Sequence, residues 1–144
     1  MSTSFDRQSS LGWLINVVAN KLKNDFDTEL KKHGLTIALW PTLMCLWEEE
    51  GVTQREIAIK SKVESSTTTR TIDKLERLHL VERRDDPQSR RSFRIYLTDE
   101  GRALQSTLIH IPVDINESML SSLDSEEQEQ MLGLLKKLVR NIDV

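Results

Sequence analysis

The sequence is poor in cysteine, proline and glycine, and it contains few aromatic residues. One cysteine among 144 residues excludes an internal disulfide and is typical of the reducing cytoplasm, where we expect this protein. No N-terminal signal pattern and no apolar run of about 18 residues is present. We therefore expect neither export nor a membrane as a partner.

Motifs for catalysis, metals and cofactors are missing as well. We find no glycine-rich phosphate loop, no H-E-x-x-H, no G-x-S-x-G and no paired-cysteine metal signature. His33, His79 and His110 are far apart in the sequence, which disfavours a histidine metal site. We expect no catalytic residue, no metal and no cofactor, so the sequence does not predict an enzyme.

Charge is distributed unevenly along the chain, whose net charge is −3. Residues 53–98 contain 11 Lys and Arg against 7 Asp and Glu, a net charge of +4, and the remainder carries −7. A basic module on an acidic body can bind nucleic acid locally while the body stays soluble.

The stretch from Lys62 to Thr98 begins with a predicted helix that has two different sides. Thr68, Ile72 and Leu75 form its core side at helical spacing. Small hydroxyls and one cation occupy the other side: Ser65, Ser66, Thr67, Thr69 and Arg70. Short side chains let a backbone approach DNA, and hydroxyls can bond phosphates or base edges in the major groove. The alternative is a solvated Ser/Thr face.

A basic hairpin follows this helix. We predict strands over Leu80–Arg84 and Ser92–Leu97, with the first strand broken at residues 85–87. Phe93, Ile95 and Leu97 alternate with Arg94 and Tyr96, as in a half-buried strand. The cationic turn suits phosphates or a narrow minor groove. The alternative is an ordinary hairpin without a role in DNA binding.

A second short helix precedes the first. Thr53 is its expected N-cap, and Glu56 is its expected capping-box partner. The order of helix, short turn at Ser61–Val63, helix and hairpin is that of a winged helix-turn-helix. This combination favours DNA binding over the two structural alternatives.

Residues 53–98 resemble the MarR family of bacterial transcription regulators, SlyA-like members included. The matching segments are TQREIA, STTTRTIDKLERLHLVERR, DPQSRR and YLTDEG, with LTIALW at residues 35–40 in addition. The resemblance implies that Arg70 holds a phosphate and that Arg90 and Arg91 form the wing tip, with Arg91 the better candidate for the minor groove. The family commonly has an acid where this chain has Ser89, which leaves two alternatives: Asp86 substitutes for that acid, or the wing is more mobile.

Amphipathic helices are predicted at both ends of the chain. The first runs over Ser9–Lys32 and is about 36 Å long, more than a small domain needs for its own core. A second, capped by Thr36, ends near Glu49. After Thr98 a further helix should break near Ile111 because of Pro112, and Asp124 with Glu127 should cap the last helix.

The terminal helices carry apolar stripes that predict a helical dimer interface. The alternative is that these helices pack on each other within one subunit, but in the family they intertwine into a homodimer. We predict a mainly α fold with a small β-wing. It comprises a helical dimerisation region, residues 1–35 and 99–144, and a winged helix-turn-helix DNA-binding domain, residues 36–98.

Three tryptophans, Trp13, Trp40 and Trp47, are candidates for an effector pocket. Relatives in the family bind aromatic and anionic compounds between the dimer helices and the DNA-binding lobe, and Trp40 matches an aromatic position there. Core packing is the equal alternative. Cys45 is expected to be a buried apolar residue and not a redox sensor. His79 stands where the family usually has glycine, at a position that often needs a positive φ.

The sequence thus predicts a cytoplasmic, nucleoid-associated transcription regulator that binds a palindromic operator in double-stranded DNA as a homodimer. A small aromatic or anionic ligand is expected to modulate it, as in a ligand-controlled repressor. Two alternatives are a winged-helix module that binds protein and an architectural or anti-silencing DNA-binding factor without a ligand.

Overall fold

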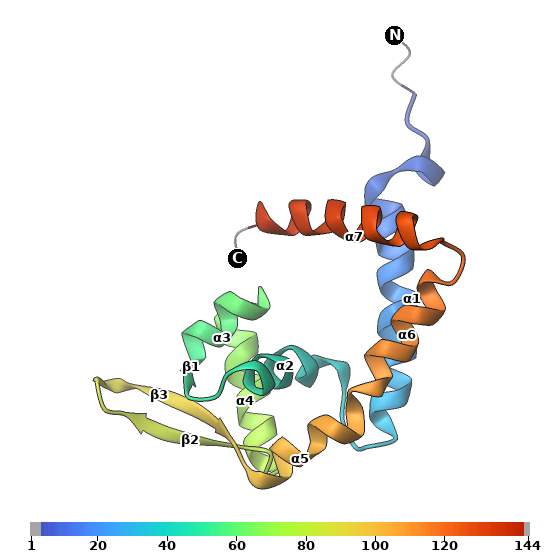
Figure 1. Cartoon of the computed structure of the whole chain (residues 1–144). Coiled ribbons are helices and arrows are strands. Elements are labelled where there is room, and N and C mark those ends of the chain that lie inside the picture. Colours follow the sequence, from blue (N-terminus) through green and yellow to red (C-terminus); the bar gives the residue numbers. More distant parts are fainter. Residues whose placement is uncertain (1–3, 143–144) are drawn as a thin grey trace.

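The computed structural model describes residues 4–142, which form a mixed lobe of short helices and a small sheet beside a region of longer helices (Figure 1). The elements in order are η1 (Arg7–Ser9), α1 (Leu11–Lys31), η2 (Ile37–Leu39), α2 (Trp40–Glu48), β1 (Val52–Thr53), α3 (Gln54–Ser61), α4 (Ser65–Arg77), β2 (Val81–Asp86), β3 (Ser89–Leu97), α5 (Asp99–Leu108), α6 (His110–Leu120) and α7 (Ser125–Arg140). Helix, turn, helix and hairpin therefore follow one another as the sequence predicted. Residues 1–3 and 143–144 of the expected helical region lie outside the described residues.

The sheet has three antiparallel strands in the order β1-β3-β2. Val81 pairs with Leu97 at the base, and Asp86 pairs with Ser89 beyond a bulge near the tip. The predicted break at residues 85–87 is wrong, because β2 continues through Asp86 and only the turn interrupts the hairpin. Strand β1, whose Val52 pairs with Ile95, was not predicted, because two residues are too few for a periodic signal.

The core of the lobe lies beneath α4 and the sheet. Ile72, Leu75 and Ile95 are fully buried, and Thr68 on the same side of α4 is 1% exposed. The Thr68 hydroxyl donates to the carbonyl oxygen of Glu64 at 3.1 Å, so burial leaves it satisfied. Phe93 was expected to share this apolar side, but it is 46% exposed. Phe93 pairs with Asp85 in the same register as Ile95 and Leu97, so its exposure comes from its place further toward the tip of the wing and not from a change of side.

Helix ends follow the predicted caps with one exception. Thr53 with Glu56 and Asp124 with Glu127 both form complete capping boxes. Thr36 is the exception, because it precedes the short helix η2 and its side chain makes no capping bond. The carboxylate of Asp27 accepts the Ile37 amide hydrogen instead, at 3.0 Å. A residue ten positions away in sequence has thus replaced the local cap.

Among residues 4–142, two non-glycine residues have left-handed backbone conformations, and both lie at the ends of helices of the lobe. His79 has φ 62°, as expected, and its carbonyl oxygen accepts the Thr98 hydroxyl at 2.7 Å. Lys62, with φ 58°, makes the turn between α3 and α4. Nearby, Gly101 permits a close approach, because an added Cβ would lie 2.2 Å from the Leu80 carbonyl oxygen.

Helices α1 and α6 run side by side, and α7 extends from the far end of α6 toward α3 (Figure 1). Leu30 is the only buried residue described for α1, and none is described for α7. Helix α5 ends at Leu108 and α6 begins at His110, so the chain breaks just before Pro112 as predicted. The two terminal helices therefore leave most of their apolar side chains uncovered within this chain.

Candidate nucleic-acid interface

The exposed side of α4 carries the hydroxyl groups that the sequence singled out. Ser65, Ser66 and Arg70 are exposed, while Thr67 and Thr69 are half-buried. The Thr69 hydroxyl donates to the Ser65 carbonyl oxygen at 3.0 Å and accepts a hydrogen bond from the Gln54 amide. Gln54 is the first residue of α3 and did not stand out in the sequence, because its role depends on how the two helices cross.

Asp86 braces the tip of the wing from within the hairpin. Its carboxylate accepts the Gln88 amide hydrogen at 3.0 Å, the Ser92 hydroxyl at 3.0 Å and Nε of Arg94 at 3.2 Å. These donors, the Gln88 amide first, hold the pKa of the Asp86 carboxyl below its usual value. Arg94 also donates to the Gly51 carbonyl oxygen at 2.7 Å, which ties the wing to the turn before α3. Asp86 thus occupies the bracing role expected when Ser89 replaced the family acid.

Several arginines of the wing are engaged in ion pairs. Arg83 bridges Asp73 and Glu76 of α4 at 2.5 and 2.9 Å, which fixes the base of the wing against that helix. Arg84 pairs with Glu82 and lies over the ring of Tyr96, 4.0 Å from its centroid. These cations are neutralised by the protein itself.

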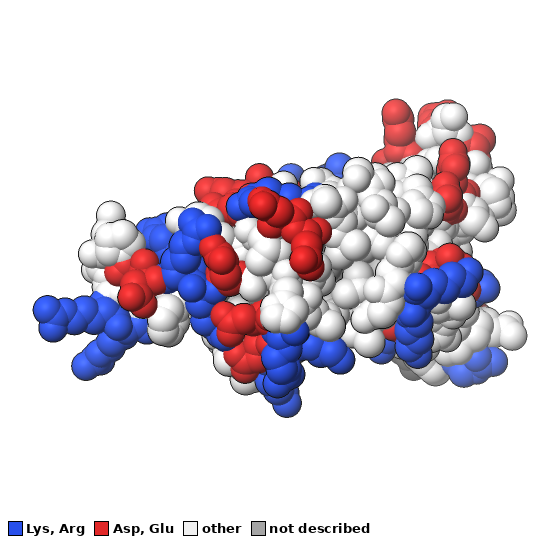
Figure 2. All heavy atoms as spheres, turned by 90° about the horizontal axis from the view of Figure 1, so that it is seen from below, with Lys and Arg blue, Asp and Glu red and all other residues white. Residues whose placement is uncertain are grey.

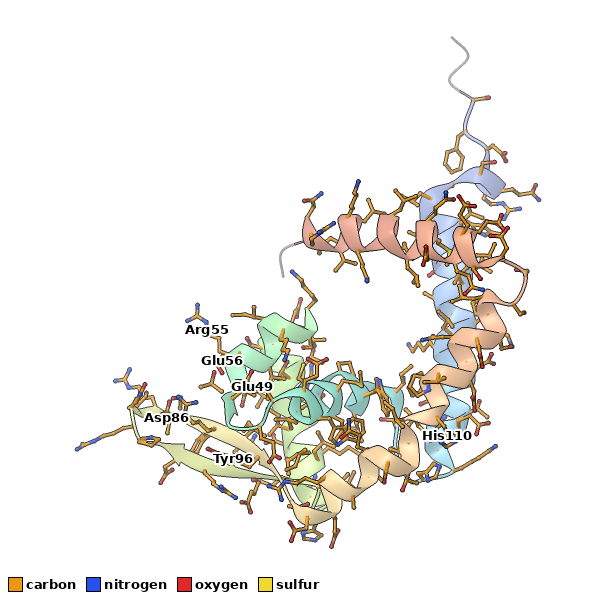
Figure 3. The ribbon with its side chains drawn as sticks, viewed as in Figure 1. Glu49, Arg55, Glu56, Asp86, Tyr96 and His110 are labelled. Carbon is orange, nitrogen blue, oxygen red and sulfur yellow. The ribbon has the colours of Figure 1, made fainter. Side chains whose placement is uncertain are left out.

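Among the arginines that form no ion pair within 4.0 Å in residues 4–142 are Arg55, Arg70, Arg90 and Arg91. Figure 2 shows basic side chains extending from the end of the molecule where the wing tip lies. Arg55 extends from α3 on the side of the wing (Figure 3). Unpaired cations on one side of the lobe are available to phosphates.

A hollow of about 530 Å³ lies where α3, α4 and the wing meet. Its walls are basic, hydroxyl and aromatic, and contain no acid: Thr53, Gln54, Arg55, Ser65, Arg91, Ser92 and Phe93. The hollow thus brings Ser65 of the helix and Arg91 of the wing, two predicted site residues, to one surface. Gln54 and Arg55 of α3 also line the hollow. They were not predicted as site residues, because in this helix the sequence indicated only the capping residues Thr53 and Glu56.

The three tryptophans do not form one cluster. Trp40 and Trp47 contact edge to face with ring centroids 5.2 Å apart, and Phe26 of α1 lies 4.7 Å from Trp40. The Trp47 indole donates to the Gly101 carbonyl oxygen at 2.9 Å, so the cluster links α1, α2 and α5. Trp13 lies elsewhere on α1, where the Arg7 guanidinium sits 4.8 Å from its ring centroid.

The remaining candidates among the described residues are the single cysteine, metal-binding clusters and membrane-spanning helices. Cys45 is 6% exposed, and burial raises the pKa of its thiol. Within residues 4–142, no three His, Cys, Asp or Glu side chains gather as a metal site requires. In the same range, every helix is too short or too polar to cross a membrane.

Comparison with known proteins gives a consistent result. The MarR family model matches residues 35–93. YybA of Bacillus subtilis, an HTH-type transcriptional regulator, is 28% identical over 129 residues, which are 90% of this chain and 86% of that protein. The S. aureus MepR–DNA complex contains a chain that is 27% identical with a TM-score of 0.85, over 92% of this chain and 98% of MepR.

The likeness in fold extends to more distant structures. BpsR of Bordetella bronchiseptica, whose DNA binding is regulated by 6-hydroxynicotinic acid, is 21% identical with a TM-score of 0.89. That alignment covers 97% of this chain and 99% of BpsR. The helix-turn-helix, the braced wing and these likenesses agree, and residues 35–93 of this chain match the MarR family of transcriptional regulators.

Proposed function

We propose that the protein binds a palindromic operator in double-stranded DNA as a homodimer and responds to a small aromatic or anionic effector. The observation that carries the DNA-binding part is the single basic surface made by α4, the start of α3 and the wing. Its unpaired arginines and its hydroxyls are the groups that bind phosphates and base edges. Helix α4 enters the major groove in this proposal, and the Arg90–Arg91 tip reaches a flanking minor groove.

The homodimer is supported by the uncovered apolar side chains of the terminal helices. Leu11, Val17 and Val18 of α1 are between 44% and 62% exposed. Leu134 and Leu138 of α7 are 62% and 46% exposed. A monomer rarely exposes so much contiguous apolar surface, whereas a second copy would bury it on both chains at once. Residues 1–35 and 99–144 are therefore proposed as the dimerisation region and residues 36–98 as the DNA-binding domain.

A two-fold dimer presents two copies of α4, and symmetric contacts require symmetric half-sites. To lie on one face of B-DNA, the half-site centres should be about 10 base pairs apart. Sedimentation equilibrium with a duplex selected from random DNA tests this proposal. Two chains should bind each site, and hydroxyl-radical footprints should show two protected regions related by a dyad. A 16.6 kDa species in solution, or one asymmetric protected region, would reject it.

The effector is proposed to act through the cluster of Phe26, Trp40 and Trp47, which joins the helical region to the DNA-binding lobe. BpsR, which shares the fold, motivates aromatic acids as the first probes. A ligand can change the distance between the DNA-binding lobes of the two subunits only if it binds one arrangement of these lobes more tightly than the other. We expect benzoate or 6-hydroxynicotinic acid to raise the melting temperature and to lower DNA affinity. No change in either quantity at millimolar ligand would exclude these compounds and leave DNA binding in place.

A further inference from the structure

The side chain of Gln54 reaches from α3 to the exposed side of α4. Its amide nitrogen donates to the hydroxyl of Thr69, fifteen residues further along the chain. Both residues are half-buried, and Gln54 also lines the hollow that contains Arg55 and Arg91. The contact therefore lies within the proposed DNA-binding surface and not in the core of the lobe.

The Thr69 hydroxyl makes two hydrogen bonds within the protein, which leave it one free lone pair. A threonine hydroxyl has one hydrogen to donate and two lone pairs that accept. The hydrogen is given to the Ser65 carbonyl oxygen at 3.0 Å, and one lone pair takes the Gln54 amide. A single lone pair is left for DNA, and the two bonds together fix the direction in which it points.

We propose that Gln54 is a positioning residue that directs the remaining Thr69 lone pair toward the major groove and so determines base preference at one operator position. This inference rests on the proposed DNA-binding function. In the major groove, adenine N6 and cytosine N4 are donors, whereas guanine N7 and O6 and thymine O4 are acceptors. An acceptor hydroxyl favours adenine or cytosine on the strand that it faces. A single hydrogen bond of ordinary strength predicts about a fivefold preference.

The rest of the lobe does not depend on this contact. Helices α3 and α4 pack through Ile57, Ala58 and Ile72, which are at most 5% exposed. The capping box that begins α3 is made by Thr53 and Glu56, and the bond from Thr69 to Ser65 stays within α4. Removing the Gln54 amide should therefore release one lone pair of the Thr69 hydroxyl without changing how the helices pack.

The test uses Gln54→Met, which keeps the length of the side chain but has no amide, together with Thr69→Ala and the double variant. Gln105→Met, at an exposed position of α5, is the matched control. Affinities are measured by fluorescence anisotropy for duplexes in which each position of a selected operator is varied in turn. Gln54→Ala is measured in parallel, and thermal melting compares the fold of each variant with that of the natural protein.

The proposal predicts that Gln54→Met and Thr69→Ala both weaken the preference for adenine or cytosine, and that they do so at the same operator position. For Thr69→Ala, which removes the hydrogen bond to the base, the preference should fall by about fivefold. The double variant should match Thr69→Ala there, and Gln105→Met should match the natural protein. Unchanged base preference in both Gln54 variants, uniform loss of affinity, or an effect at another position would overturn the inference alone. If the natural protein shows no base preference anywhere, the proposed function fails and this inference with it.

Discussion

Arg91 at the tip of the wing offers the most quantitative test of the DNA-binding surface. It forms no ion pair within 4.0 Å among the described residues, so its charge is available to DNA. Each phosphate neutralised on B-DNA contributes about 0.9 to the slope of log affinity against log salt. Arg91→Ala removes one cation from each subunit, so the slope for the dimer should fall by about 1.8. Between 50 and 200 mM salt, the natural protein should then lose about 12-fold more affinity than the variant.

The assay is a salt titration of DNA binding by fluorescence anisotropy. Lys32→Ala is the control, because Lys32 is a solvent-exposed cation at the end of α1, paired with Glu29 at 2.9 Å. It removes the same formal charge from the opposite region and should leave the slope unchanged. Equal slopes for Arg91→Ala and the natural protein would refute the assignment of the wing tip to DNA. An equal reduction by Lys32→Ala would show that net charge alone is responsible.

Three further predictions concern the scaffold behind this surface. The stabilisation from Asp86 should be present above its usual pKa of 3.8 and be lost as the pH falls through the lowered folded-state pKa, because the neutral carboxyl is a poorer acceptor. An NMR titration that places this pKa at or above 3.8 would contradict the bracing role. Gly101→Ala should lower the free energy of unfolding by about 1–3 kcal/mol in urea, because its Cβ would collide with the Leu80 carbonyl oxygen. An unchanged urea midpoint of unfolding would show that the backbone at Gly101 can move to make room for the added methyl group at no cost in stability. Cys45 should react with iodoacetamide far more slowly in the folded protein than in urea, because burial raises its thiol pKa; equal rates would show that the thiol is accessible.

Local signals explain why so much of the fold was predictable. Capping boxes at Thr53 and Asp124 are made by residues three positions apart, and helical spacing placed Ile72 and Leu75 in the core. Features that depend on distant residues were missed. The cap at Ile37 comes from Asp27, and the Asp86 carboxylate at the end of β2 accepts hydrogen bonds from Gln88, Ser92 and Arg94.

The candidate site also contains residues that the sequence predicted and residues that only the packing of distant elements reveals. The hydroxyls of α4 and the arginines of the wing tip were evident from residue type and from the family resemblance. Gln54 and Arg55 of α3 were not, because only the crossing of α3 and α4 brings them to the hollow. Equally, the sequence could not separate free arginines from paired ones, since Arg83 finds its partners Asp73 and Glu76 on another element.

Selection from random double-stranded DNA is the most direct test of the central claim, that two copies of this surface bind DNA around a dyad. The full-length protein is incubated with the pool at about 100 mM salt, and the retained duplexes are sequenced through successive rounds. The account predicts enrichment of imperfect palindromes whose half-site centres are about 10 base pairs apart. Retained sequences with no common pattern, or with a single half-site and no symmetric counterpart, would contradict it.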